Sequence, residues 1–129
     1  MSGKKAKVLI IEDDVWFADS LISGLKDFEV GFANDPDNVF SEIEKNKPDV
    51  IVADIVLGSK NLFTLLNEMQ SYVDTRSIPV IILSSQAKQI NLVDVESLFV
   101  KAVIDKTEVT PELINREIAA LVDKDGEMT

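Results

Sequence analysis

The chain of 129 residues contains no cysteine and no histidine. Without cysteine there is no disulfide framework and no thiolate metal site. Without histidine there is no imidazole-bound zinc, no Ser-His-Asp or Cys-His catalysis, and no phosphohistidine relay within the chain. Carboxylates, hydroxyls and ammonium groups must therefore carry any chemistry.

Long hydrophobic runs and basic charge are also scarce. No stretch approaches the roughly 20 apolar residues of a membrane span, and the N-terminal MSGKKAK lacks the apolar region of a signal peptide. The formal net charge is −10, from 13 basic and 23 acidic residues. Such a surface repels nucleic-acid phosphates and anionic membranes. We therefore expect a cytoplasmic protein that binds neither nucleic acid nor a membrane directly.

What the chain does have is enough apolar residues for a core. Hydrophobic residues make up 46% of the sequence, and a chain of this length can bury a sizeable core. By length it is one domain. We expect a single domain over residues 1–129, with a core over about 6–124 and without internal repeats or linkers.

Short apolar runs alternate with helical patterns along the chain. Continuous apolar or β-branched runs predict strands over residues 6–11, 29–33, 48–57, 78–85 and 101–105. Apolar spacings of three and four predict helices over residues 14–28, 34–46, 62–72, 87–98 and 110–124. Asp35 and Thr110 are N-cap candidates, each followed by a proline at the first helical position. Five strands alternating with five helices indicate a doubly wound α/β sheet.

Polar residues stand at the ends of four of these predicted strands. They are Glu12 and Asp13, then Asp54, then Ser84 and Ser85, and finally Asp105 and Lys106. In open parallel sheets, ligands bind outside the carboxyl ends of the strands, so we expect these side chains to meet at one rim. Three clustered carboxylates coexist only with a divalent cation or a proton among them. Mg²⁺ prefers such oxygen ligands.

The stretches LIIEDD, VIVADI, PVIILSS and VIDK resemble the receiver domain of two-component response regulators, in its chemotaxis-regulator-like form. The resemblance covers nearly the whole chain, with separations of 41, 30 and 22 residues from Asp13 through Asp54 and Ser84 to Lys106. It implies a flavodoxin-like (βα)5 three-layer sandwich around a five-stranded parallel sheet, with strand order 2-1-3-4-5. It also implies a phosphoacceptor signalling domain that depends on Mg²⁺.

The resemblance assigns roles to the residues at the rim. Asp54 would accept a phosphoryl group, and Ser84 and Lys106 would offset the charge on its oxygens. The Mg²⁺ ligands would be Glu12, Asp13, Asp54 and the backbone carbonyl of Val56. Asp14 would start the following helix and not be a ligand. Such a protein is not a conventional enzyme, although it catalyses its own aspartyl phosphorylation and dephosphorylation.

The resemblance also implies partners. The phosphoryl donor would be a sensor histidine kinase, a histidine phosphotransfer protein or a small acyl phosphate. A downstream effector would bind the face formed by the fourth helix, fifth strand and fifth helix, around Phe99 and Val103 and near Lys101 and Glu108. A second copy of the chain, in a homodimer, is a further partner that the resemblance allows.

Three features depart from the family pattern. Thr107 follows Lys106 where the family usually has proline, so we expect a trans peptide bond and a differently shaped loop. Val103 stands where the family usually has tyrosine or phenylalanine, which puts the aromatic part of the usual switch in doubt. The loop after Asp54 reads IVLGSKNLF instead of the common proline- and glycine-containing form. None of these changes removes a residue assigned to the phosphoryl chemistry.

Alternative functions remain at this point. A degenerate receiver would act as a phosphorylation-independent interaction module, which Val103 and Thr107 favour. A haloacid-dehalogenase-like phosphatase would need a second aspartate as general acid at the position of Val56. A flavodoxin-like cofactor binder would need a phosphate-binding loop after the first strand, and none is present.

Trp16 is the only tryptophan and follows the acidic residues closely. It lies one residue, about 100°, off the apolar stripe of Phe17, Leu21 and Leu25. We expect its ring to be partly exposed beside the acidic residues, with ordinary helix packing as the alternative.

Overall fold

Five parallel strands form the central sheet of the computed structural model, which describes residues 5–54, 56–57, 60–91 and 95–127. The strands are β1 (Lys7–Ile11), β2 (Glu29–Ala33), β3 (Val50–Asp54), β6 (Val80–Ser84) and β7 (Val100–Asp105). Their spatial order is β2-β1-β3-β6-β7, and all four neighbouring pairs are parallel. The predicted doubly wound sheet and its strand order 2-1-3-4-5 are confirmed.

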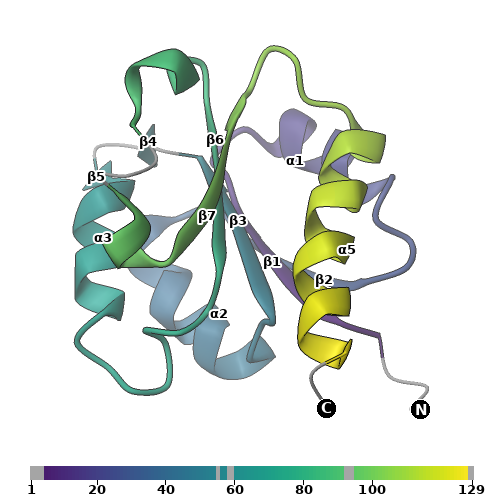
Figure 1. Ribbon diagram of the computed structural model, residues 1–129. Coiled ribbons are helices and arrows are strands. Elements are labelled where there is room, and N and C mark those ends of the chain that lie inside the picture. Colours follow the sequence, from purple (N-terminus) through teal and green to yellow (C-terminus); the bar gives the residue numbers. More distant parts are fainter. Residues whose placement is uncertain (1–4, 55, 58–59, 92–94, 128–129) are drawn as a thin grey trace.

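Helices cover both faces of the sheet (Figure 1). Helices α1 (Val15–Ile22) and α5 (Pro111–Glu127) lie on one side, and α2 (Val39–Asn46) and α3 (Leu62–Met69) on the other. Successive residues of a strand point to opposite faces. In β1, Val8 and Ile10 pack with the α1 and α5 side, whereas Leu9 and Ile11 pack with the α2 and α3 side. This double burial explains why the central strands read as continuous apolar runs.

Helix α1 is shorter than the sequence pattern predicts, because it ends at Ile22 and not near residue 28. The chain leaves the helix through a tight turn in which the Gly24 amide donates to the Leu21 carbonyl over 3.0 Å. A Cβ atom at Gly24 would collide with Pro111 at the start of α5. Asn115 of α5 also donates to the Gly24 carbonyl over 3.2 Å. The close approach of α5 therefore accounts for the glycine where α1 ends.

The predicted helix starts at Asp35 and Thr110 are confirmed. The Asp35 carboxylate accepts the Asp37 amide over 2.9 Å and caps a 3-10 turn, Pro36–Asn38, that leads into α2. The Thr110 hydroxyl accepts the Leu113 amide over 3.1 Å at the start of α5.

Two other segments differ from the expected pattern. The strand predicted over 48–57 stops at Asp54, and β4 (Val56–Leu57) then pairs antiparallel with β5 (Lys60–Asn61). Within the helix predicted over 87–98, the structure has 3-10 turns at Ala87–Gln89 and Glu96–Leu98, and residues 92–94 lie outside the described part. Among the described helices, none is long and apolar enough to cross a membrane.

Candidate functional site

Three carboxylates meet where β1 and β3 end. Asp54 is the last residue of β3, and Glu12 and Asp13 directly follow β1. The two strands are neighbours in register, with Ile11 opposite Ala53, so their ends lie side by side. One carboxylate oxygen from each of Glu12, Asp13 and Asp54 lies within 4.8 Å of the others. The strand-end placement read from the sequence thus brings these three side chains together.

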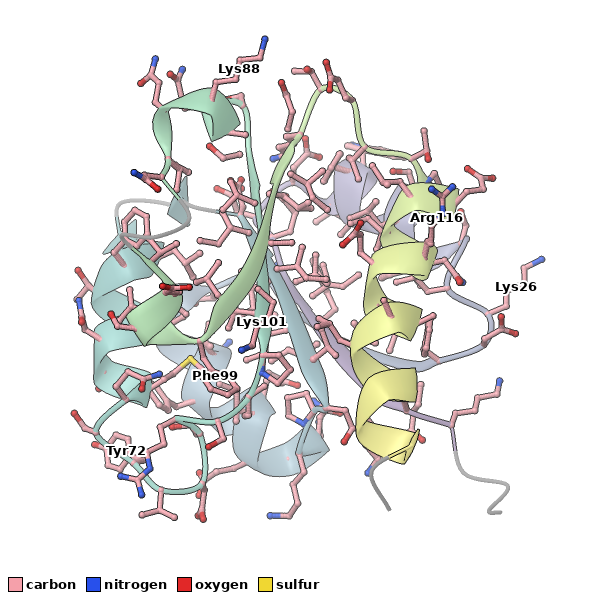
Figure 2. All side chains as sticks on the ribbon, viewed as in Figure 1. Lys26, Tyr72, Lys88, Phe99, Lys101 and Arg116 are labelled. Atoms are coloured by element: carbon pink, nitrogen blue, oxygen red, sulfur yellow. The ribbon has the colours of Figure 1, made fainter. Side chains whose placement is uncertain are left out.

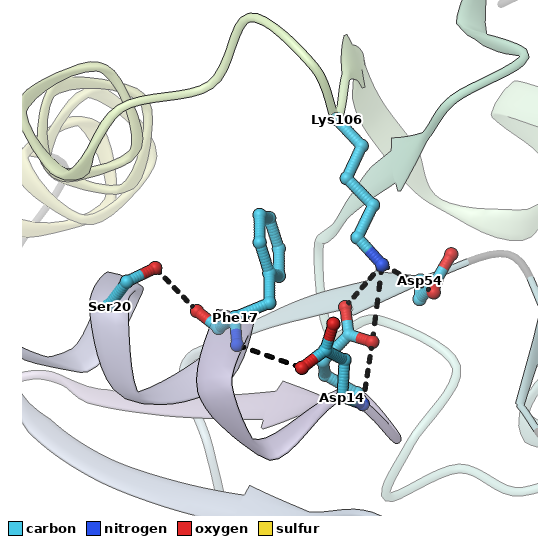
Figure 3. Close-up of polar contacts among 6 residues, drawn as sticks. Asp14, Phe17, Ser20, Asp54 and Lys106 are labelled. Carbon is cyan, nitrogen blue, oxygen red and sulfur yellow. Dashed lines mark hydrogen bonds and ion pairs between the residues drawn. The ribbon is translucent and has the colours of Figure 1, made fainter.

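Lys106 reaches this cluster from the end of β7 (Figure 3). Its Nζ atom lies 2.9 Å from Asp54 Oδ2 and 3.2 Å from Glu12 Oε2. The Lys106 amide donates to the Ser84 carbonyl over 3.0 Å, which fixes the start of the side chain at the neighbouring strand β6. The ammonium therefore pairs with both strand-end carboxylates at once.

Glu12 is the most buried member of the cluster, with 1% of its side chain exposed. Burial raises its pKa from 4.5 to about 7, and the negative charge of Asp54 adds to the rise. Hydrogen bonds from the Asp14 amide, at 3.0 Å, and from Lys106 oppose it. The Oε1 atom lies 3.0 Å from Lys106 Nζ but accepts no hydrogen bond of acceptable geometry. Glu12 thus holds one buried oxygen whose hydrogen-bonding capacity is unused.

The pKa of Lys106 is raised, although burial, the largest single influence, lowers it. The hydrogen bonds to Asp54 and Glu12 and the charges of both carboxylates together outweigh that burial. Its side chain is 23% exposed. The lysine therefore stays charged, and it offsets one of the three negative charges that the cluster can carry.

Asp13 and Asp14 are adjacent but have separate places. Asp14 is the N-cap of α1, where its Oδ1 atom accepts the Phe17 amide over 3.1 Å (Figure 3). It is not among the three clustered carboxylates. The sequence prediction that Asp14 starts the helix is confirmed.

Ser84 ends β6 opposite Asp105 of β7 and is fully buried. Its hydroxyl accepts the Gln86 amide over 2.9 Å. A hydroxyl that accepts one hydrogen bond still has its own proton to donate. Val56 lies in β4, two residues after Asp54, and pairs with Asn61. Its assignment as a backbone ligand stays a prediction.

Sequence reasoning missed the contact between Phe17 and Lys106. The sequence pattern places Phe17 on the apolar stripe of the first helix, but its ring also lies beside the lysine, with Lys106 Nζ 4.6 Å from the ring centroid (Figure 3). Side chains in the first turn of a helix lean back toward its N-terminus. For Phe17 that direction leads toward the strand ends and was the available signal.

The loop after β7 is held by hydrogen bonds to the side chain of Asp105. The Asp105 Oδ1 atom accepts both the Thr107 amide, at 2.9 Å, and the Thr107 hydroxyl, at 2.7 Å. These two hydrogen bonds hold the pKa of Asp105 below its usual range. The Lys106–Thr107 peptide bond is trans, as expected from the sequence.

The donor set fits a hard divalent cation. Three carboxylates converge, one buried oxygen of Glu12 accepts no hydrogen bond, and Lys106 alone does not neutralise the cluster. Oxygen ligands in this number suit Mg²⁺, which keeps several waters and uses few protein carboxylates.

Comparisons with known proteins show the family and the fold of the chain. The family model of the response regulator receiver domain matches residues 8–117. A CheY-like receiver domain protein from Methanospirillum hungatei JF-1 has a TM-score of 0.83 at 22% identity, covering 98% of this chain and 100% of that chain. The signal receiver domain of a DNA-binding response regulator, merR, from Colwellia psychrerythraea 34H gives 0.80 at 25% identity, covering 92% and 98%. The chemotaxis response regulator CheY4 of Vibrio cholerae gives 0.77 at 18% identity, covering 92% and 99%. No curated protein matches the sequence.

Proposed function

The chain belongs to the family of response regulator receiver domains, and we propose that Asp54 is its phosphoacceptor. One receiver domain would occupy residues 1–129, with its core over about 6–124. The phosphoryl group would come from a sensor histidine kinase, a histidine phosphotransfer protein or a small acyl phosphate. Its arrival would switch the binding of a downstream partner.

The observation that carries this proposal is the Lys106 ammonium, 2.9 Å from Asp54 in an acidic cluster at the strand ends. With acetyl phosphate as donor, an Asp54 carboxylate oxygen forms a bond to phosphorus. The bond from phosphorus to the acetyl oxygen breaks, and acetate leaves. Negative charge on the phosphoryl oxygens is offset by Lys106 and by the proton that the Ser84 hydroxyl has to donate.

Glu12, Asp13, Asp54 and the Val56 carbonyl would hold Mg²⁺. When bound, the ion supplies positive charge that offsets the repulsion between the carboxylates and the phosphoryl oxygens. The chain's own part is to keep Glu12 buried and ready to accept a cation and to leave Asp13 exposed toward solvent.

For the output surface we propose the face of β7, α5 and the segment before β7. Phe99 and Lys101 lie together there (Figure 2), with Lys101 Nζ 4.0 Å from the ring centroid of Phe99. Val103 of β7 is half-buried against the core on the α2 and α3 side. An effector at this face would meet a half-buried ring under a positive charge, beside a strand that carries Lys106 at its end.

The test is phosphorylation by acetyl phosphate with Mg²⁺, followed by intact mass. We expect one added phosphoryl group in the wild type and none in Asp54→Asn. Asp14→Asn is the matched control, because it removes one charge from the same region and leaves the three clustered carboxylates in place. Equal labelling of Asp54→Asn and wild type would overturn the assignment. A wild type that takes up no phosphate would favour the degenerate, phosphorylation-independent module instead.

A further inference from the structure

We propose that the Phe17 ring is a positioning element that holds the Lys106 ammonium at Asp54. This inference rests on the proposed function, because it gives Phe17 a role in the transfer to Asp54. Phe17 acts through Lys106 and does not touch the reacting atoms.

The ammonium sits between a ring and two carboxylates. Lys106 Nζ is 4.6 Å from the Phe17 ring centroid, 2.9 Å from Asp54 Oδ2 and 3.0 Å from Glu12 Oε1. A cation within about 6 Å of a ring centroid is attracted by the negative face of the ring. Burial of most of the lysine side chain, which is 23% exposed, strengthens that attraction.

The ring does something that the carboxylates do not. Lysine has a flexible four-carbon stem whose rotamers must be restricted if the ammonium is to stay in one place. Glu12 and Asp54 restrict it, but both are also proposed ligands of a cation, which would compete with the lysine for their charge. The ring of Phe17 is a neutral hydrocarbon, so it attracts the ammonium whether or not the carboxylates of Glu12 and Asp54 also bind a cation.

The position of Phe17 is fixed by elements other than the lysine. Its amide donates to the Asp14 carboxylate, and its carbonyl accepts the Ser20 hydroxyl over 2.7 Å (Figure 3). The ring also packs against the core cluster beneath α1 and α5. A ring anchored in this way gives the flexible lysine side chain a fixed surface to contact.

The alternative is that Phe17 is only a packing residue. The chain offers a matched control for this, because Phe32 is half-buried against the same core cluster. Among the described residues, cation–ring contacts occur at Phe17 and Phe99, and Phe32 has none. Phe32→Leu should therefore cost stability as Phe17→Leu does, without changing the transfer to Asp54.

The first measurement needs no phosphorylation. In metal-free wild type, proton–carbon correlation spectra should show the Lys106 ε-methylene signals shifted upfield by the ring, with Lys106→Arg used for assignment. Phe17→Leu should return these signals to the range of the exposed lysines. The Lys101 signals, which the Phe99 ring should shift, must stay in place in Phe17→Leu as an internal control.

The second measurement separates attraction from packing. Phenylalanine at position 17 is replaced by 4-fluoro-, 3,5-difluoro- and 3,4,5-trifluorophenylalanine, which weaken the negative ring face stepwise and change its size little. The rate of Asp54 labelling by acetyl phosphate should fall stepwise, to about one fifth in the trifluoro variant and in Phe17→Leu. The same series at Phe32 should leave the rate unchanged.

Two results would overturn the inference. One is an unshifted Lys106 signal in the folded wild type, which would mean that the ammonium is not held at the ring. The other is a labelling rate that stays flat across the fluorinated series at position 17. A wild type that is not labelled at Asp54 overturns the proposed function, and the Lys106 signal then decides by itself whether the ring holds the ammonium.

Discussion

Replacing Lys106 by methionine removes the ammonium from between Asp54 and Glu12 and keeps most of the length of the side chain. Glu12 then remains buried, with 1% of its side chain exposed. Removing one partner of a buried ion pair costs about 3–5 kcal/mol. Lys106 is 23% exposed and Glu12 can take up a proton, so we expect a loss of about 2 kcal/mol in the free energy of unfolding at pH 8 without divalent metal.

The loss should depend on pH through Glu12. Folding raises the pKa of Glu12 from 4.5 to about 7, so the fold favours the neutral carboxyl. Stability from this group is fully present below pH 4.5 and is lost as the pH rises through 7. In the wild type this amounts to about 3 kcal/mol over that window. Lys106 lowers the pKa of Glu12, so in Lys106→Met this loss of stability should extend to higher pH. At pH 5 the Glu12 carboxyl is neutral in both proteins, so Lys106→Met should lower the free energy of unfolding by less than about 1 kcal/mol.

Urea unfolding in the presence of a chelator, at pH 5 and pH 8, tests this with Lys106→Met, Glu12→Gln and the double variant. At pH 8 we expect a coupling of about 1.5 kcal/mol between the two positions, and close to none at pH 5. Glu12→Gln should flatten the pH dependence, because glutamine does not titrate. Equal stability of wild type and Lys106→Met at pH 8, or a cycle without coupling, would show that the ammonium does not compensate the buried carboxylate.

Two further predictions concern the acidic stretch and the tryptophan beside it. In calorimetric titrations, Asp13→Asn should weaken Mg²⁺ binding at least about tenfold. Asp14→Asn should leave Mg²⁺ binding nearly unchanged, because asparagine is an equally good N-cap. Similar losses of affinity in both variants would contradict the different positions of the two residues. Trp16 is 85% exposed, as its place off the apolar stripe predicted, and it neighbours Phe17 in the first turn of α1. Beryllofluoride with Mg²⁺ should change its fluorescence in wild type and not in Asp54→Asn. If the fluorescence does not change although the ligands are shown to be bound, Trp16 is not near enough to the site to respond to it.

The central strands and the carboxylate cluster could be predicted from the sequence for one physical reason. A parallel strand covered on both faces must be apolar throughout, so β1, β3 and β6 stand out as continuous runs. The first polar residue after such a run then marks the end of the strand. Glu12 is the first polar residue after the apolar run of β1, and Asp54 is the first after the run of β3. Because β1 and β3 are neighbouring parallel strands, their ends bring the two carboxylates together.

Elements that depend on contacts between distant segments were not predictable in this way. Gly24, directly after the end of α1, lies so close to Pro111 at the start of α5 that a side chain there would collide, and this contact joins segments far apart in the sequence. The β4 and β5 pair has two residues in each strand, too few for an alternating pattern to show. Phe17 fits the apolar stripe of α1, so the stripe gave no reason to look for a contact with Lys106, and the lean of a first-turn side chain toward the strand ends was the one signal for it.

In the loop that carries Lys106, hydrogen bonds hold the backbone at the position where the family pattern has a proline. A proline would fix the backbone after the lysine through its ring. Here the Asp105 carboxylate accepts the amide and the hydroxyl of Thr107, while the Lys106 amide donates to the Ser84 carbonyl. The backbone of the lysine is therefore held on one side by the sheet and on the other by a side-chain turn. A flexible side chain reaches one place only when both its starting point and its end are held. These hydrogen bonds hold the starting point, the backbone of Lys106. The carboxylates of Glu12 and Asp54 and the Phe17 ring hold the end, the ammonium at Asp54.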